Sequence, residues 1–229
     1  MKQNLDPGAT DGRSYSLNDM VRTGCKDCEG CSACCQGMGS SVVLTPKDMY
    51  QLALCLGTDF SQLLGDKVEL QVEDGIILPN LRMGENENCV FLNAQGRCSI
   101  HAFRPGVCRL FPLGRSYEKD GIHYIYLVNG CKKTDRTKVK VRKWIDTPDI
   151  EKEEAFLIKW HGFRKAAIEA ARAGEGEERE ARGKAVSMSL LKTFYLLPYD
   201  THRDFYEQFE ERLIAAYGEL KKMYTSFGI

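Results

Sequence analysis

Five cysteines within eleven residues constrain this chain more than any other feature of its sequence. They are Cys25, Cys28, Cys31, Cys34 and Cys35, in the string CKDCEGCSACC. Three successive C-x-x-C steps end in an adjacent pair, a pattern that core packing does not require. Each C-x-x-C turn can bring two sulfurs to one metal, and serial steps are typical of iron–sulfur ligation. The string therefore predicts a metal centre.

Four further cysteines follow at wider spacing: Cys89, Cys98, Cys108 and Cys131. The remaining one, Cys55, lies alone in a predicted helix, where we expect a small buried apolar side chain. Nine candidate ligands exceed what one site needs. Eight would supply two all-cysteine [4Fe–4S] clusters or two four-cysteine zinc sites, and the alternative is one site with a few structural thiols.

The start of the chain and its net charge restrict the cellular compartment and the classes of binding partner that we expect. The first residues contain no apolar stretch typical of a secretory signal, and no apolar run is long enough to span a bilayer. We therefore expect a cytoplasmic protein whose thiols stay reduced, which argues against a disulfide framework. The 32 basic and 32 acidic residues balance, so we expect neither nucleic acid nor a membrane surface as a partner.

The order of the expected elements predicts an α+β fold. In this fold a small cysteine-rich region of antiparallel hairpins holds the metal, and a helical C-terminal half follows. We expect a flexible N-terminal lead-in over residues 1–20, a cysteine-cluster metal-binding α+β domain over 21–145 and a helical C-terminal region over 146–229.

Capping residues and turn signals locate the elements of the first half. Thr45 is a plausible N-cap, followed by Pro46 and Asp48, and Gly57 ends the helix. Three hairpins are expected around turns at residues 73–75, 94–96 and 120–121, because glycine follows polar residues between apolar alternating runs. The alternating residues 138–144 predict one more strand.

Helical patterns dominate the second half. A long helix should open at Thr147-Pro148-Asp149 and run to about residue 173. The charged, glycine-containing stretch 174–183 is expected to be a mobile connector or a frayed helix end. Two further helices are expected over about 184–196 and 200–224, and the last has an apolar face that could dock a protein partner.

Three residues near the later cysteines have two readings each. His101, three residues after Cys98, could be a metal ligand or a donor to one, or it could simply cap a turn. Arg104 and Arg109 flank Cys108. They could offset thiolate charge and donate to sulfur, or they could form salt bridges that hold an irregular loop.

Four blocks, in this order, resemble the YkgJ-type cysteine-cluster family. The blocks are the C-x-x-C-x-x-C-C string from Cys28, the CVFL element, the GRCSI element and RPGVCRLFP. The family is known as a zinc- or iron-chelating domain, and the resemblance covers about residues 25–115. It implies a chelating set of Cys28, Cys31, Cys34, Cys35, Cys89, Cys98 and Cys108. The ligand roles of Cys25 and Cys131 rest on spacing alone.

The sequence favours a cytoplasmic metal-binding protein with a cysteine-ligated centre. We expect one or two iron–sulfur clusters, or zinc, serving redox chemistry or a modification reaction. One alternative is a zinc-stabilised module that docks a protein partner through the C-terminal helices. Another is an enzyme similar to flagellin lysine N-methylase, a relative of the resembled family that shares the cysteine cluster. No independent catalytic set supports that last alternative, so the sequence leaves open whether the chain is an enzyme.

Overall fold

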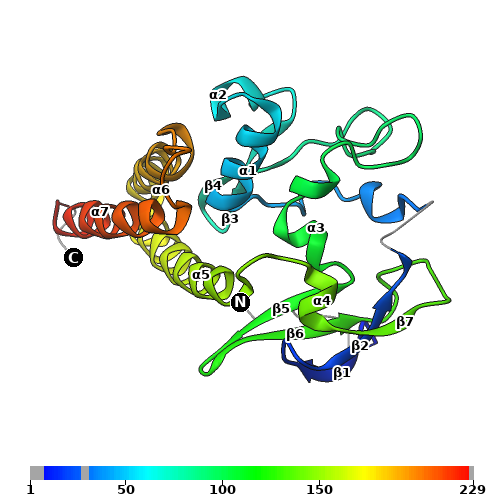
Figure 1. Cartoon of the computed structure of the whole chain (residues 1–229). Helices are drawn as coiled ribbons and strands as arrows, with labels where there is room; N and C mark the ends of the chain where they lie inside the picture. Colours follow the sequence, from blue (N-terminus) through cyan, green and yellow to red (C-terminus); the bar gives the residue numbers. More distant parts are fainter. Residues whose placement is uncertain (1–7, 27–30, 227–229) are drawn as a thin grey trace. The chain divides into compact units, whose positions relative to one another are not determined.

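The computed structural model describes residues 8–26 and 31–226 and confirms the α+β class (Figure 1). The chain divides into two compact units. The cysteine-rich unit is Met1–Val42 with Met83–Ile158, and the helical unit is Val43–Arg82 with Lys159–Ile229. The expected boundaries at 20 and 145 therefore differ from the observed division, because the chain enters the helical unit early, leaves it and returns.

The elements alternate between the units along the chain. The strands are β1 (Thr10–Tyr15), β2 (Met20–Gly24), β3 (Val68–Glu73), β4 (Ile76–Leu81), β5 (Leu113–Glu118), β6 (Gly121–Leu127) and β7 (Thr137–Lys140). The α-helices are α1 (Pro46–Leu56), α2 (Phe60–Leu63), α3 (Gly106–Leu110), α4 (Val141–Ile145), α5 (Ile150–Arg172), α6 (Gly176–Leu191) and α7 (Phe205–Ser226). Short 3₁₀ turns form η2 (Ala33–Cys35) and η3 (His101–Phe103), and a π-helical turn forms η4 (Lys192–Leu196).

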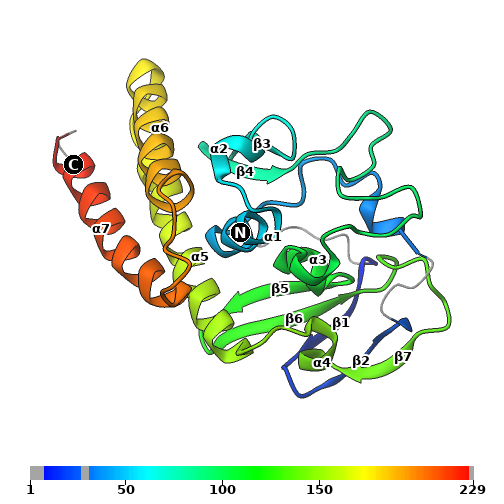
Figure 2. The same ribbon diagram turned by 45° about the horizontal axis from the view of Figure 1, so that its top comes forward.

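Two small antiparallel sheets frame the cysteine-rich unit. One has the strand order β1-β6-β5, and the other pairs β2 with β7. The expected hairpin at residues 120–121 is confirmed as β5–β6, with Gly114 opposite Ile125. β1 and the start of β2 lie within the stretch 1–20 that the sequence suggested was a lead-in (Figure 2).

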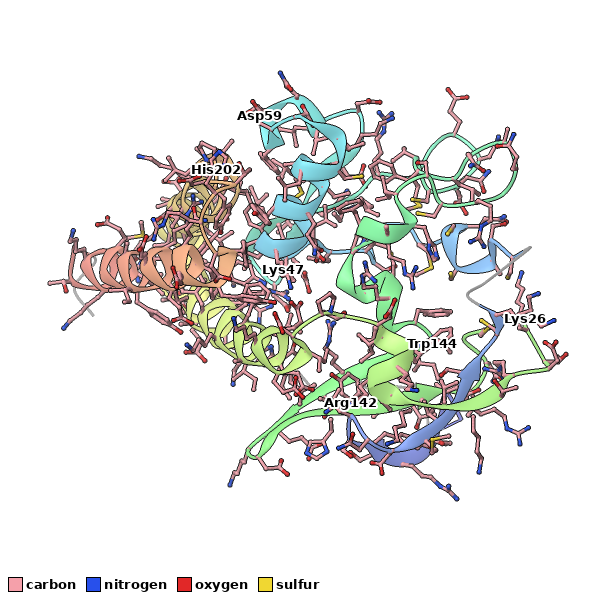
Figure 3. The ribbon with its side chains drawn as sticks, in the orientation of Figure 1. Lys26, Lys47, Asp59, Arg142, Trp144 and His202 are labelled. Atoms are coloured by element: carbon pink, nitrogen blue, oxygen red, sulfur yellow. The ribbon has the colours of Figure 1, made fainter. Side chains whose placement is uncertain are left out.

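A compact apolar cluster supports these sheets. Its buried members are Val21, Leu110, Leu113, Tyr124, Tyr126, Val141, Ile145 and Ile150. Two polar groups of this unit have hydrogen-bond partners: the Tyr124 hydroxyl donates to Glu154 Oε1 at 2.7 Å, and Trp144 Nε1 donates to the Leu110 carbonyl at 3.2 Å. Trp144 lies in α4 (Figure 3). The buried members of the cluster come from the sheets, from the short helices α3 and α4 and, for Ile150, from the start of α5, and none of them is a cysteine.

In the helical unit, α1 begins and ends where the sequence predicts. The Thr45 hydroxyl accepts from Asp48 N, and the Asp48 carboxylate accepts from Thr45 N at 2.8 Å, which forms a capping box. Gly57 ends the helix with a φ of 63°. Cys55 is half-buried rather than buried as expected.

The β3–β4 hairpin, also predicted, belongs to the helical unit because of its contacts with α6. Ile77 N donates to Ser187 Oγ at 3.0 Å, and Arg172 donates to the Asp74 carbonyl at 2.7 Å. These bonds tie residues about a hundred positions apart along the chain. The sequence pattern did not indicate them, which is why the domain boundaries could not be predicted.

An aromatic cluster forms the core of the helical unit. Trp160 lies edge-on to Phe194 with ring centroids 5.1 Å apart, and Phe163 lies 5.1 Å from Phe194. Phe209 is fully buried and 5.7 Å from Phe194. Such rings bury large apolar areas and prefer these tilted and edge-on geometries. The helical unit therefore has an apolar core of its own.

Three expected elements are wrong in part. Residues 89–99 form turns with isolated bridges instead of a hairpin, because Asn93 Oδ1 accepts from Gln95 N and Arg97 N and so satisfies backbone donors locally. Only the first part of 138–144 is a strand, and α4 follows it. Most of the expected connector 174–183 is the start of α6.

The charges of that connector explain its helix. Glu178 pairs with Arg182, and Glu180 pairs with Lys184 at 2.7 Å, each four residues apart. Such spacing places the partners on one helix face and supports helix formation. None of the helices in the described part of the chain is long and apolar enough to cross a membrane.

Candidate metal centre

Four of the predicted ligands come together in the cysteine-rich unit; we call Cys34, Cys35, Cys89 and Cys98 the four-thiol group. Cys34 and Cys35 lie in η2. Residue 89 is brought to them by an antiparallel pairing, in which Cys89 N donates to the Cys35 carbonyl at 2.7 Å and Gly37 N donates to the Glu87 carbonyl at 2.8 Å. Cys98 is brought to this segment through its bridge with Leu92. A pairing between distant segments therefore brings Cys89 to η2, and a bridge between residues close in sequence brings Cys98 there.

The thiols of this group interact strongly. The pKa of Cys34 is lowered to about 7, chiefly by a hydrogen bond from the Cys35 thiol, with a smaller contribution from the charge of Arg104. The same bond, followed by burial and the charges of Cys89 and Cys98, raises the pKa of Cys35. Adjacent cysteines could have supplied separate sites, but the structure places both in one group.

Burial opposes ionisation of the other two thiols. It is the largest cause of the raised pKa of Cys89 and of Cys98. The charges of Arg104 and Arg97 act in the opposite direction on Cys98. Buried thiols that repel one another as thiolates are stabilised when a metal cation neutralises them.

Arg104 and Arg109 have different roles. Arg104 acts on Cys34 and Cys98 as described, while its Nη1 lies within hydrogen-bond distance of both ring nitrogens of His101. His101 therefore contacts the guanidinium group that faces the thiols. Arg109 donates to the Ala102 carbonyl and to the Asp146 carbonyl, the latter at 3.1 Å, and so holds the loop in place.

Three further candidate ligands, Cys25, Cys31 and Cys131, are linked by charge interactions. Cys25 directly follows β2, and β2 pairs with β7 so that Gly24 lies opposite Thr137. Cys131 lies in the segment that leads into β7. Burial is the main cause of the raised pKa of Cys131, and the negative charges of Cys25 and Cys31 raise it further.

The remaining predicted ligands are placed as follows. Cys108 is half-buried in α3, and its N–H donates to the Pro105 carbonyl at 2.9 Å. Cys28 lies outside the described residues. Cys55 lies in α1, which belongs to the helical unit, and it is not part of the four-thiol group.

The thiols are spread more widely than the ligands of a closed zinc site. Within residues 8–26 and 31–226, one set of three potential ligand atoms lies within 4.8 Å of one another, and it comprises Glu118, Asp120 and His123. A tetrahedron with zinc–sulfur bonds of about 2.3 Å would hold its sulfurs about 3.8 Å apart. The Glu118 set surrounds an exposed hairpin turn, where acidic groups commonly lie without a metal.

The donor set fits a soft metal centre. Four thiolates around Zn²⁺ or around a [4Fe–4S] core of charge 2+ leave two negative charges. Arg97 and Arg104, both acting on Cys98, supply two positive charges. The sequence pointed to Arg104 but missed Arg97, whose only signal was its place beside Cys98 in GRCSI.

Comparison with known families adds an independent result. Residues 27–143, just over half of the chain, match the model of the CxxCxxCC family, described as "Putative zinc- or iron-chelating domain". The match includes the whole four-thiol group and leaves Cys25 outside it. Neither the curated proteins nor the solved structures contain a match to this chain.

Proposed function

The chain belongs to the CxxCxxCC family of zinc- or iron-chelating domains, and on that premise we propose that its four-thiol group holds an iron–sulfur cluster for redox chemistry or for a modification reaction. One observation carries the proposal: Cys34 and Cys35 lie in η2, Cys89 N donates to the Cys35 carbonyl at 2.7 Å, and the Leu92–Cys98 bridge brings Cys98 to the same segment. When bound, such a cluster supplies a one-electron redox couple.

The ligand pattern favours iron–sulfur over zinc as the occupant. Serial C-x-x-C steps are typical of chains that wrap around a cluster and give one sulfur to each iron. The wide spread of the sulfurs in the described residues also suits a core larger than one ion. Hydrogen-bond donors and positive charge near cluster sulfurs raise a reduction potential, and Arg97 and Arg104 would supply the charge here.

A cavity in the cysteine-rich unit supports a reaction that involves a second molecule. Its volume is about 830 Å³, and its lining includes His101 and Arg104. Arg142 and Glu151, paired at 3.0 Å, also line it. A polar molecule in this cavity would meet Arg104, whose charge acts on Cys34.

Metal and acid-labile sulfide analysis with an absorption spectrum, on protein purified without oxygen, tests the proposal. We expect iron with matching sulfide and a broad visible absorption band. Cys89→Ser should lose the iron and sulfide of this group, whereas the matched variant Cys55→Ser should retain them. A colourless protein with stoichiometric zinc, or one with no metal, would contradict the iron–sulfur proposal.

A second candidate function is a zinc-stabilised module that docks a protein partner. It is favoured by a cavity of about 530 Å³ in the helical unit, lined by Tyr50, Leu54, Leu197 and Tyr199 among others. The Leu197 side chain remains 46% exposed there, and exposed apolar surface of this kind often marks an interaction site. Zinc without sulfide, together with an apolar dye that binds the native protein and no longer binds Leu197→Glu, would support this candidate; iron with sulfide would oppose it.

A further inference from the structure

The cavity of about 830 Å³ in the cysteine-rich unit is lined by charged side chains of both signs. Its cations are Arg104, Arg109, Arg142 and Lys143, and its carboxylates are Asp146, Asp149 and Glu151. The stretch 101–109 contains no acidic residue, so it brings only positive charge to the lining, whereas the stretch 142–151 brings both signs. A ligand would therefore meet cations on one part of the lining and mixed charges on the other.

Neutral acceptors hold the two arginines of the first stretch. Arg109 donates to the Ala102 carbonyl and, at 3.1 Å, to the Asp146 carbonyl. Arg104 Nη1 donates to the His101 carbonyl at 3.2 Å and lies 2.8 Å from His101 Nδ1. These bonds fix the orientation of both guanidinium groups without offsetting their charge. Because a planar guanidinium group binds two oxygens of a phosphate or carboxylate at once, the first stretch is suited to an oxyanion.

Arg142 adds a further donor on the second stretch. It lies in α4 (Figure 3), and its Nη2 atom pairs with Glu151 Oε1 at 3.0 Å. Its Nε atom is buried and has no hydrogen-bond partner among the residues that the structure describes. A buried N–H group without an acceptor is costly. Since Arg142 lines the cavity, a ligand oxygen at this part of the lining would supply the missing acceptor.

The carboxylates of the second stretch differ in what they already bind. A bond from its own N–H group, followed by the bond from Arg142, keeps the pKa of Glu151 below its usual value, so Glu151 is ionised and engaged. Asp146 and Asp149 lie on the two sides of Thr147-Pro148 with φ values of 47° and 49°. Their carboxylate oxygens can accept from hydroxyl or amino groups. The second stretch is therefore suited to the donor groups of a ligand.

We propose that this cavity binds a small molecule that carries a phosphate or carboxylate group together with hydroxyl or amino groups. Arg104 and Arg109 bind the oxyanion, Arg142 donates to a ligand oxygen, and the carboxylates of Asp146 and Asp149 accept from the hydroxyl or amino groups. The inference rests on the proposed function, because this molecule would be the second reactant, and it deepens that function by naming the chemical class of the reactant.

Calorimetric titration of the full chain, purified without oxygen, tests the proposal with three probes. Ribose 5-phosphate carries a phosphate and hydroxyl groups, gluconate carries a carboxylate and hydroxyl groups, and ribose carries hydroxyl groups alone. We expect saturable binding of at least one of the two anions, which identifies the preferred oxyanion, and binding of ribose that is about ten-fold weaker or more. No binding of either anion, or ribose binding as tight as theirs, would overturn the proposal.

Two substitutions test the cations. Arg104→Gln should weaken binding of the anion about 10–100-fold, because it removes a charged donor. Arg142→Lys keeps a positive charge near Glu151 but removes the Nε–H group, and it should weaken binding roughly two- to ten-fold. Arg22→Gln changes an exposed arginine of β2 that does not line the cavity and should bind as the wild type does. Unchanged binding in the first two variants, or an equal loss in all three, would overturn the site.

Asp149→Asn tests the carboxylate part of the site. Asparagine adopts a positive φ as aspartate does, so the backbone should be kept. The loss of a negative charge should strengthen binding of inorganic phosphate, roughly two-fold or more, because repulsion is reduced. Ribose 5-phosphate or gluconate should gain less or lose affinity, since a charged acceptor of their hydroxyl groups is lost. An equal gain for inorganic phosphate and for the bound probe would overturn the role given to Asp149.

Iron and sulfide content, measured on the same samples, separates this inference from the proposed function. If iron and sulfide are present but neither anion binds, the inference is wrong and the proposed function stands. If an anion binds in a way that depends on Arg104 and Arg142 while iron and sulfide are absent, the binding site stands and the proposed function fails.

Discussion

The two units of this chain reach a folded state by different physical means. The helical unit buries a cluster of aromatic rings around Trp160, Phe194 and Phe209. The cysteine-rich unit has an apolar cluster under its small sheets, but its thiol-bearing stretches 31–42 and 83–105 consist mainly of turns and isolated bridges. Apolar burial organises the helical unit, and we propose that metal ligation organises much of the thiol-bearing part of the other.

The largest expected effect comes from removing one ligand. Cys89→Ser should abolish metal binding at the four-thiol group and lower the yield of soluble protein several-fold, because the remaining thiolates and buried polar backbone lose their organising cation. Cys55→Ser changes a cysteine of similar exposure in the helical unit and should behave as the wild type. Metal content and soluble yield measure both. Equal metal content and soluble yield in the two variants would contradict the difference proposed between the two units.

A substitution that leaves a large cavity in the aromatic core should have the opposite effects: it should destabilise the helical unit and leave metal binding unchanged. Phe209 is fully buried, and Phe209→Ala should cost about 3–5 kcal/mol of unfolding free energy in the helical unit. Metal content per folded chain should not change. Denaturant unfolding followed by Trp160 fluorescence measures the first quantity. Ile214→Ala, at a 74% exposed position of the same helix, should change the free energy by no more than about 0.5 kcal/mol.

A smaller effect is expected at the capping box of α1. Thr45→Ala removes the acceptor of the Asp48 N–H group and should cost about 1 kcal/mol. Thermal unfolding of the helical unit measures this loss, and metal release by EDTA should be unaffected. Thr225→Ala, in the last turn of α7 where it caps no helix N-terminus, serves as the control. A change in metal release for Thr45→Ala would show that the two units depend on one another.

The smallest expected effect concerns the ionisation of one thiol in metal-free protein. The pKa of Cys34 is about 7, so its alkylation rate should rise with pH through that value, because the thiolate is the nucleophile. Arg104→Gln should raise this pKa and lower the rate at pH 7 roughly two- to five-fold. Arg97→Gln should leave Cys34 unchanged. If the pH dependence of Cys34 alkylation is the same in Arg104→Gln as in the wild type, Arg104 does not act on the Cys34 thiol.

Local signals in the sequence predicted local structure well. The N-cap at Thr45, the end of α1 at Gly57 and the turns of β3–β4 and β5–β6 depend on neighbouring residues, and all are confirmed. The hairpin expected around residue 95 was wrong because the side chain of Asn93 satisfies the backbone there. A pattern of apolar residues does not show that a side chain competes with a neighbouring strand for backbone N–H groups.

Contacts between distant residues could not be predicted in the same way. The bond between Ile77 and Ser187, which draws the β3–β4 hairpin into the helical unit, has no counterpart in the local pattern. The cysteine spacing indicates which thiols are candidate ligands, but it does not divide them into groups. That division depends on the β2–β7 register and on the pairing of Cys35 with Cys89.

The central claim is that metal ligation organises the cysteine-rich unit and not the helical unit. Amide hydrogen exchange read by mass spectrometry, on the full chain before and after metal removal without oxygen, tests it most directly. The account predicts that protection is lost in residues 31–42 and 83–105 and retained in 43–82 and 159–226. Equal loss in both units, or unchanged protection in the cysteine-rich unit of a chain shown to have lost its metal, would contradict it.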